Sequence, residues 1–195
     1  MKAPLVKKLL DLLSRAKVCS KVVHTSSNGL PLGAESNDKF FKALMVDIGL
    51  VSASLGLSSV KFPDLDSMLL SNKGGLTEQF VGQQLRAAQT PAMDPRLFYW
   101  QRTNGRQGEI DYVLQHGACI IPVEVKSGAA GSMKSLHQFM SEKNLKIAVR
   151  LDANPPSIEE MSVKTTQGQL VKYQLLSLPL YLAGNINALL KNLLA

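Results

Sequence analysis

The feature that most limits how this chain can fold is a pair of apolar runs separated by a short break. The runs cover 110–114 and 120–125, and His116 and Gly117 lie between them. Two such runs around a glycine-containing break predict a β-hairpin. The second run is nearly continuous, which is typical of a strand buried on both faces. We therefore expect a sheet with this hairpin near its centre.

Three charged residues lie in this apolar hairpin, where charge is costly unless it is paired or binds a metal. Asp111 is in the first run, and Glu124 and Lys126 close the second run as Val-Glu-Val-Lys. Because side chains alternate along a strand, Glu124 and Lys126 should share a face, and the hairpin should bring Asp111 beside them. The alternative is a solvated strand end, because Glu-X-Lys alone is a short pattern.

The two carboxylates suit a hard divalent cation, Mg²⁺ or Mn²⁺. A lysine beside them can position a water molecule or neutralise the charge that develops on a phosphate, so the set predicts metal-assisted cleavage of a phosphodiester. If Asp111 and Glu124 converge without metal, at least one should have a raised pKa unless Lys126 compensates. Glu109 lies two residues before Asp111. It is either a further metal ligand, a group that contacts the ligands rather than the metal, or a solvated charge.

The same residues follow one another in a known order: a glutamate on a predicted helix (Glu78 in LTEQFVGQQL), Asp111 on a strand, and Glu124-Val125-Lys126 on the next. This order resembles the PD-(D/E)XK nuclease superfamily. The resemblance implies a restriction-endonuclease-like α/β fold with a mixed central sheet flanked by helices. It also implies that Glu78, Asp111 and Glu124 hold the metal and that Lys126 is the catalytic lysine. Ile110 replaces the proline that names the motif.

Five segments in order carry a closer resemblance: FFKALMVDIGL (40–50), GGLTEQFVGQQL (74–85), LFYWQRTNGRQGEIDYVL (97–114), IIPVEVKSG (121–129) and LSLPLYLAG (176–184). They are similar to the uncharacterised C-terminal domain of many bacterial and archaeal AAA+ family ATPases. In that family a nuclease-like fold follows an ATPase module and a winged-helix piece. This sequence has no GxxxxGK[ST] phosphate loop. We therefore expect either a fragment whose ATPase module lies elsewhere in a longer protein, which the direct opening into an amphipathic helix favours, or a domain that stands alone.

The patterning predicts three parts. We expect a partial winged-helix-like segment over 1–60, a linker over 61–73 and the nuclease-like domain over 74–195. The first part should hold a helix at 3–16, strands at 17–24 and 39–48, and then a short helix to about 57. The last part should hold helices at 75–89, 133–143 and 179–194 and strands at 97–102, 109–115, 118–126, 146–151 and 169–175, with a Pro-Pro loop after 151.

Charge points to the partner. The chain has 22 Lys and Arg against 15 Asp and Glu, a formal net charge of +7, which favours a polyanion such as DNA. Arg102 and Arg106 flank a turn that could present them to phosphates, although a solvated loop is an equal alternative. Gln138, on a helix after the lysine strand, is a further candidate for contact with nucleic acid.

Two observations bear on the compartment. Cys19 and Cys119 lie far apart without metal-ligand spacing, which is typical of a reducing cytoplasm. No apolar stretch reaches the roughly 18 residues of a membrane-spanning helix. We therefore expect a cytoplasmic protein without a membrane segment.

Overall fold

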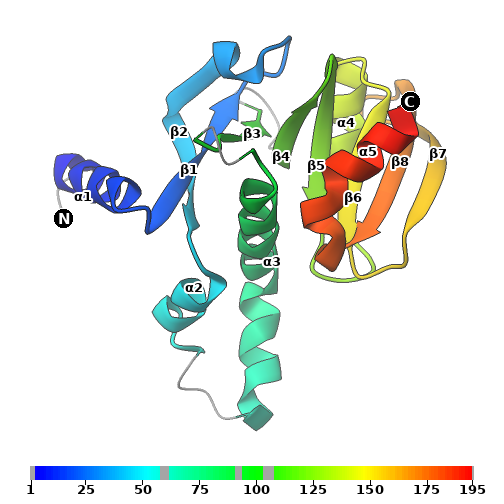
Figure 1. Ribbon diagram of the computed structural model, residues 1–195. Helices are drawn as coiled ribbons and strands as arrows, with labels where there is room; N and C mark the ends of the chain where they lie inside the picture. Colours follow the sequence, from blue (N-terminus) through cyan, green and yellow to red (C-terminus); the bar gives the residue numbers. More distant parts are fainter. Residues whose placement is uncertain (1–2, 58–61, 91–93, 103–107, 195) are drawn as a thin grey trace.

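A computed structural model describes residues 3–57, 62–90, 94–102 and 108–194, and these form one mixed β-sheet flanked by helices (Figure 1). The predicted α/β class is therefore confirmed. In order across the sheet, the strands are β2 (Ser36–Met45), β1 (Cys19–Thr25), β3 (Leu97–Gln101), β4 (Glu109–His116), β5 (Cys119–Val125), β6 (Ile147–Asp152), β8 (Leu170–Pro179) and β7 (Ser157–Lys164).

The strand direction reverses four times across the sheet. β1 pairs antiparallel with β2 and parallel with β3, and β3, β4 and β5 are antiparallel to one another. β5, β6 and β8 run parallel, and β7 returns antiparallel to β8 at the far edge. The two edge strands are thus β2 and β7.

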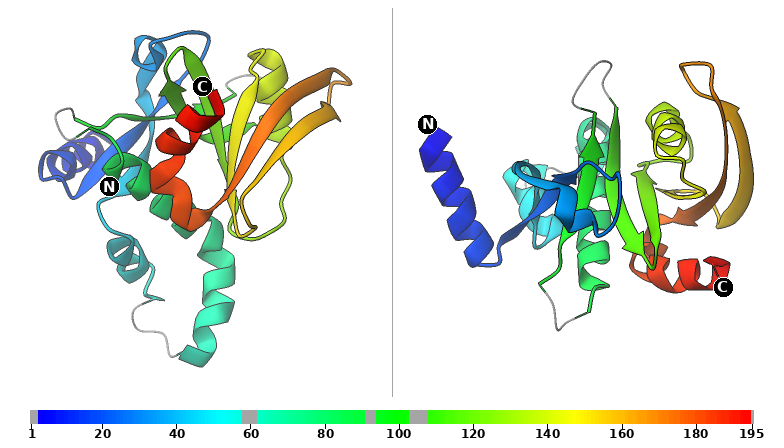
Figure 2. Two further views of the ribbon diagram at one scale, coloured as in Figure 1. Left: turned by 45° about the vertical axis from the view of Figure 1, so that its right-hand side comes forward. Right: turned by 90° about the horizontal axis from the view of Figure 1, so that it is seen from above.

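Each face of the sheet has its own apolar cluster. The helices are α1 (Ala3–Arg15), α2 (Ile48–Ser54), α3 (Phe62–Ala87), α4 (Lys134–Glu142) and α5 (Ile186–Leu194). On one face, Val81 of α3 and Leu190 of α5 pack with Val123 of β5. On the other, Phe139 of α4 packs with Ile110 of β4. α1 projects from the body beside β1 (Figures 1 and 2).

The predicted hairpin is confirmed. β4 and β5 pair antiparallel from Tyr112↔Val123 to His116↔Cys119, and Gly117 takes the positive φ of 56° that the tight turn requires. β5 lies between β4 and β6, and its Val123 is fully buried, as expected for a central strand.

The sheet divides where the charged residues lie. The β4–β5 ladder ends at Tyr112↔Val123, just before Asp111 and Glu124 would face each other. Beyond that point β4 still pairs with β3 at Glu109, and β5 still pairs with β6 at Val125. The two central strands therefore separate at one end and leave a notch between them.

A change of register in β4 turns its side chains toward α3. The β3–β4 pairing shifts between Phe98 and Trp100. Ile110 packs in the cluster beneath α4, whereas Tyr112 packs in the cluster beneath α3, although strict alternation would place both on one face. The Tyr112 hydroxyl donates to the backbone oxygen of Glu78 at 2.8 Å. This irregularity therefore ties the start of β4 to α3.

The N-terminal part differs from the expected division. Its helix, strand and strand occur in the predicted order, but β1 and β2 extend the same sheet through the β1–β3 pairing. The expected linker at 61–73 lies almost wholly inside α3, which is one helix from Phe62 to Ala87 rather than a helix that begins at 75. The predicted domain boundary at 73–74 thus lies inside a continuous helix.

Two further predictions were wrong. The prediction left the range from 152 to 168 as a Pro-Pro loop without a strand, but β7 occupies Ser157–Lys164. This edge strand buries little, since Ile158 and two adjacent glutamates face solvent, and so it lacks a strong apolar pattern. The helix predicted at 179–194 is divided in two. A 3-10 helix, η3 (Leu180–Asn185), comes first, and α5, which is shorter than the predicted helix, follows it.

Gly82 provides a test of the contact between α3 and β4. A Cβ there would lie 2.4 Å from the Tyr112 hydroxyl and 2.7 Å from Leu44 Cδ1. Gly82→Ala should lower the free energy of unfolding by about 1–2 kcal/mol, because overpacking outweighs the gain in helix propensity. Gly75→Ala, in the same helix but with open space around it, should raise it by about 0.5–1 kcal/mol. Urea unfolding of both variants checks the pair, and a stabilised Gly82→Ala would contradict the close approach.

Candidate metal centre

Three carboxylates, from β4 and α3, meet at the notch between β4 and β5. Glu78 comes from α3, and Glu109 and Asp111 come from β4. One oxygen from each lies within 4.8 Å of the other two, and all three residues are half-buried. Two ligands of one Mg²⁺ ion lie at most about 4.2 Å apart, twice the ligand distance, so small side-chain rotations would bring this acidic trio to ligand geometry.

Asp111 is fixed by the split in the sheet. Its Oδ2 accepts a hydrogen bond of 2.7 Å from the Val125 amide, a group that the ended ladder leaves without a strand partner. Burial, the charge of Glu124 and the charge of Glu78 raise the pKa of Asp111 to about 7, against the opposing effects of the Val125 amide and Lys42. The carboxyl group is thus held in place while its ionised form is disfavoured.

Glu124 and Lys126 form a second, more buried pair. Lys126 Nζ donates to Glu124 Oε1 at 2.5 Å, and the Glu124 side chain is only 7% exposed. Among the residues that the structure describes, Glu124 Oε2 has no hydrogen-bond partner. Burial raises the pKa of Glu124 although Lys126 lowers it. The pKa values of Asp111 and Glu124 are thus both raised, as predicted for at least one of the two acids, but burial rather than mutual repulsion is the largest cause.

The structure does not place Glu124 inside the acidic trio. Val123 and Val125 both pack beneath α3, so strand alternation turns Glu124 toward the other face. Consistently, burial and then the charge of Glu124 raise the pKa of Tyr173, which packs beneath α4. Glu124 and the trio still affect each other, since Asp111 and Glu109 are both within electrostatic range.

Lys42 is the site residue that the sequence analysis missed. Its ammonium, from β2, contacts Glu78 Oε1 at 2.6 Å and also forms an ion pair with Glu109. It also lies 5.0 Å from the centre of the Tyr99 ring. Burial lowers the pKa of Lys42, but Glu78 and Glu109 outweigh it, so the pKa is raised. No local pattern marked Lys42, because its partners are 36 and more residues away in the chain.

The loop after β5 holds the stem of Lys126. A Cβ at Gly131 would lie 2.7 Å from Lys126 Cδ, so the glycine backbone rests directly on the lysine side chain. Two side chains fix this loop. Arg150, on β6, donates to the Ala129 oxygen at 3.0 Å, and Asn154, just after β6, donates to the same oxygen at 2.8 Å.

The predicted nucleic-acid contacts are mostly occupied. Arg102 forms an ion pair with Glu142. Gln138 is buried, and its amide hydrogen-bonds to Glu142 at 3.2 Å and to Thr166 at 3.4 Å. In this conformation the Gln138 amide is bonded within the fold, and its contact with nucleic acid stays a prediction. Arg106 lies outside the described residues.

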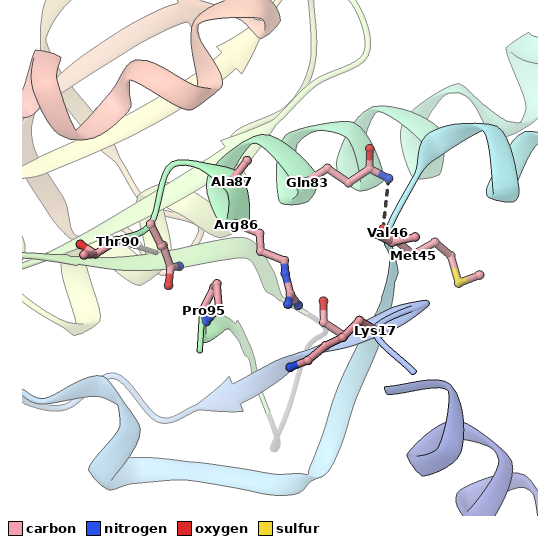
Figure 3. Close-up of a pocket in the computed structure, with 10 residues that line it drawn as sticks. Lys17, Met45, Val46, Gln83, Arg86, Ala87, Thr90 and Pro95 are labelled. Carbon is pink, nitrogen blue, oxygen red and sulfur yellow. Dashed lines mark hydrogen bonds between the residues drawn. The ribbon is translucent and has the colours of Figure 1, made fainter. Parts of the chain in front are cut away.

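A separate pocket, lined by residues of α3, β1 and β2, contains no member of the trio (Figure 3). Its lining includes Lys17, Arg86, Gln83 and Met45, and Gln83 donates to the Met45 backbone oxygen at 3.1 Å. Both cations are partly compensated by Asp94, at 3.3 Å from Lys17 and 3.9 Å from Arg86. The pocket therefore lacks a free basic cluster, and the acidic trio is the stronger candidate site.

The fold and this cluster define a mixed α/β domain with a candidate metal centre. Residues 73–179 match the family described as Domain of unknown function (DUF4143), and the chain belongs to this family. A search of curated proteins and one of solved structures found no match to the chain. The matched region contains the acidic trio, Glu124 and Lys126, but not Lys42. No described helix is both long and apolar enough to cross a membrane.

Proposed function

We propose that the domain is a metal-dependent, nuclease-like module that acts on DNA phosphodiesters. The observation that carries the proposal is the convergence of Glu78, Glu109 and Asp111 at the split of the sheet, next to the buried Glu124–Lys126 pair. Burial and the charges of Glu124 and Glu78 raise the pKa of Asp111, and a carboxyl group perturbed in this way is typical of a site that binds a cation. A strand end that only faced solvent would not bury an unpartnered carboxylate oxygen.

The residues suggest a division of roles. Mg²⁺ or Mn²⁺ would polarise a phosphoryl oxygen. Glu78 and Asp111 would hold the ion, Glu109 is the third member of the trio, and Glu124 Oε2 is a further oxygen without a protein partner. Lys126, whose stem is held by the 127–131 loop, would direct its ammonium at the phosphate or at the attacking water. The net charge of +7 favours binding of the DNA backbone.

The resemblance to the C-terminal domain of AAA+ family ATPases supports a further part of the proposal. The module would act as the C-terminal part of such an ATPase, so an ATPase module is the proposed protein partner. Metal-dependent cutting would then occur at DNA brought by that partner.

One observation favours a second function, a non-catalytic DNA- or protein-interaction module of an ATPase whose site is retained but idle. Lys42 already neutralises two members of the trio, and Arg102 is paired within the fold. A domain with these internal ion pairs could bind a partner without cutting DNA.

Calorimetric titration with Mn²⁺ tests the metal site. The wild type should bind with measurable heat, and Asp111→Ala should lose that binding, because it removes one of the three carboxylates of the trio. Glu35→Ala, which removes a carboxylate outside the site, is the matched control and should bind as the wild type does. Equal binding by wild type and Asp111→Ala would remove the basis of the proposal.

A further inference from the structure

We infer that the Lys42 ammonium occupies the place of a divalent cation in the acidic trio, so that metal binds only when Lys42 leaves; this rests on the metal site proposed above. The ammonium contacts Glu78 at 2.6 Å and is paired with Glu109. These are two of the three carboxylates whose oxygens lie within 4.8 Å of one another. A cation that bridged the trio would have to lie where the ammonium now is.

Lys42 reaches the trio from outside the family region. It is on β2, an edge strand that pairs only with β1, where Lys42 lies opposite Val22. The family match begins at residue 73, whereas all three carboxylates lie within it. The N-terminal strands therefore supply the cation that neutralises the acidic residues of the family domain.

The side chain is able to leave. Its side chain is 24% exposed, and apart from the two ion pairs its ammonium lies over the face of Tyr99. A long lysine side chain can keep its ammonium in water while its stem stays on an apolar surface. A divalent ion carries twice the charge into the same group of carboxylates, so metal and Lys42 compete for one place.

Mn²⁺ titration of four forms of the whole chain tests this competition. Lys42→Met should bind Mn²⁺ at least about tenfold more tightly than the wild type, since no ammonium has to be displaced. Lys42→Arg keeps the charge at the trio and should bind no more tightly than the wild type. Lys39→Met, on the same strand but exposed, removes an equal charge and should match the wild type, which controls for net charge.

The outcomes separate this inference from the metal proposal. If the wild type binds Mn²⁺ and a folded Lys42→Met binds equally or more weakly, Lys42 does not compete, and only this inference is overturned. If neither form binds Mn²⁺, the metal site and the competition are both overturned. An advantage of Lys42→Met that disappears in high salt would mark a long-range charge effect instead of displacement, and it would also overturn the inference.

A second measurement uses the unmodified chain. Competition for one place is reciprocal, so Mn²⁺ must drive Lys42 out to the same extent that Lys42 weakens Mn²⁺. Saturating Mn²⁺ should therefore increase labelling of Lys42 by an amine-reactive reagent several-fold, with Lys39 labelling unchanged, as read by mass spectrometry of peptides. Labelling of Lys42 that stays constant or falls would show that metal and ammonium do not exclude each other.

Discussion

Replacing Lys126 by alanine should reduce Mn²⁺-dependent cleavage of DNA by at least about 100-fold, because its ammonium no longer stabilises the charge that develops on the phosphate. DNA binding should stay near the wild-type level, since one charge among many contributes little to affinity. That binding should fall steeply with salt, as it does when a basic surface displaces counterions. Nicking of supercoiled DNA measures the first effect and fluorescence anisotropy the second.

Three controls accompany this prediction. Lys134→Ala removes an exposed lysine of α4 and should cut DNA as the wild type does. Lys126→Ala leaves the buried Glu124 carboxylate without its partner, and this can reduce activity by unfolding the protein. Lys126→Arg keeps a cation beside Glu124 and therefore controls for that effect. Asp111→Ala should lose metal binding and cleavage together. A wild type that binds DNA yet never cuts it would instead support the interaction-module function.

The second large effect is on stability, which should fall as pH rises from about 4 to about 8. Folding raises the pKa of Asp111 from 3.8 to about 7, so the folded state favours the protonated group. The stability that this group contributes is therefore complete below the unfolded value and is lost as pH passes through 7. At about 1.4 kcal/mol per pKa unit, with an allowance for partial exposure, the loss is on the order of 2–4 kcal/mol. Burial gives Glu124 a shift in the same direction.

Asp111→Asn isolates this effect, because its amide oxygen can still accept from the Val125 amide. The variant should be more stable than the wild type at pH 8 and closer to it at pH 4. Urea unfolding at both pH values measures the difference between the two proteins, in which the titration of all other groups largely cancels. A difference that does not change with pH would mean that Asp111 titrates as an ordinary surface acid.

The local parts of the fold could be predicted from the sequence. Apolar runs on both sides of Gly117 define β4 and β5, and the helix predicted at 133–143 is α4 (Lys134–Glu142). β7 could not be predicted in the same way, because an edge strand that exposes Ile158 needs no apolar alternation. The start of α3 was missed because Pro63, Asp64 and Asp66 were interpreted as linker residues, although a helix accepts proline in its first turn.

The candidate site was only partly predictable for a related reason. The spacing in Glu124-Val125-Lys126 fixes an ion pair within one strand, and that pair was found where expected. Two features depend on contacts between distant segments: the change of register that turns Asp111 toward Glu78, and the approach of Lys42 from β2. Spacing along the chain contains no information about either one, since both arise from how the sheet is assembled.

The early end of the β4–β5 ladder has one more consequence. It leaves the Val125 amide bonded to a carboxylate, so this single N–H senses the ionisation and position of Asp111 directly. Its chemical shift follows whether that oxygen carries a charge, and its rate of exchange with deuterium follows whether the bond is made. Val125 thus gives the notch an intrinsic spectroscopic probe, which needs neither a label nor a substrate.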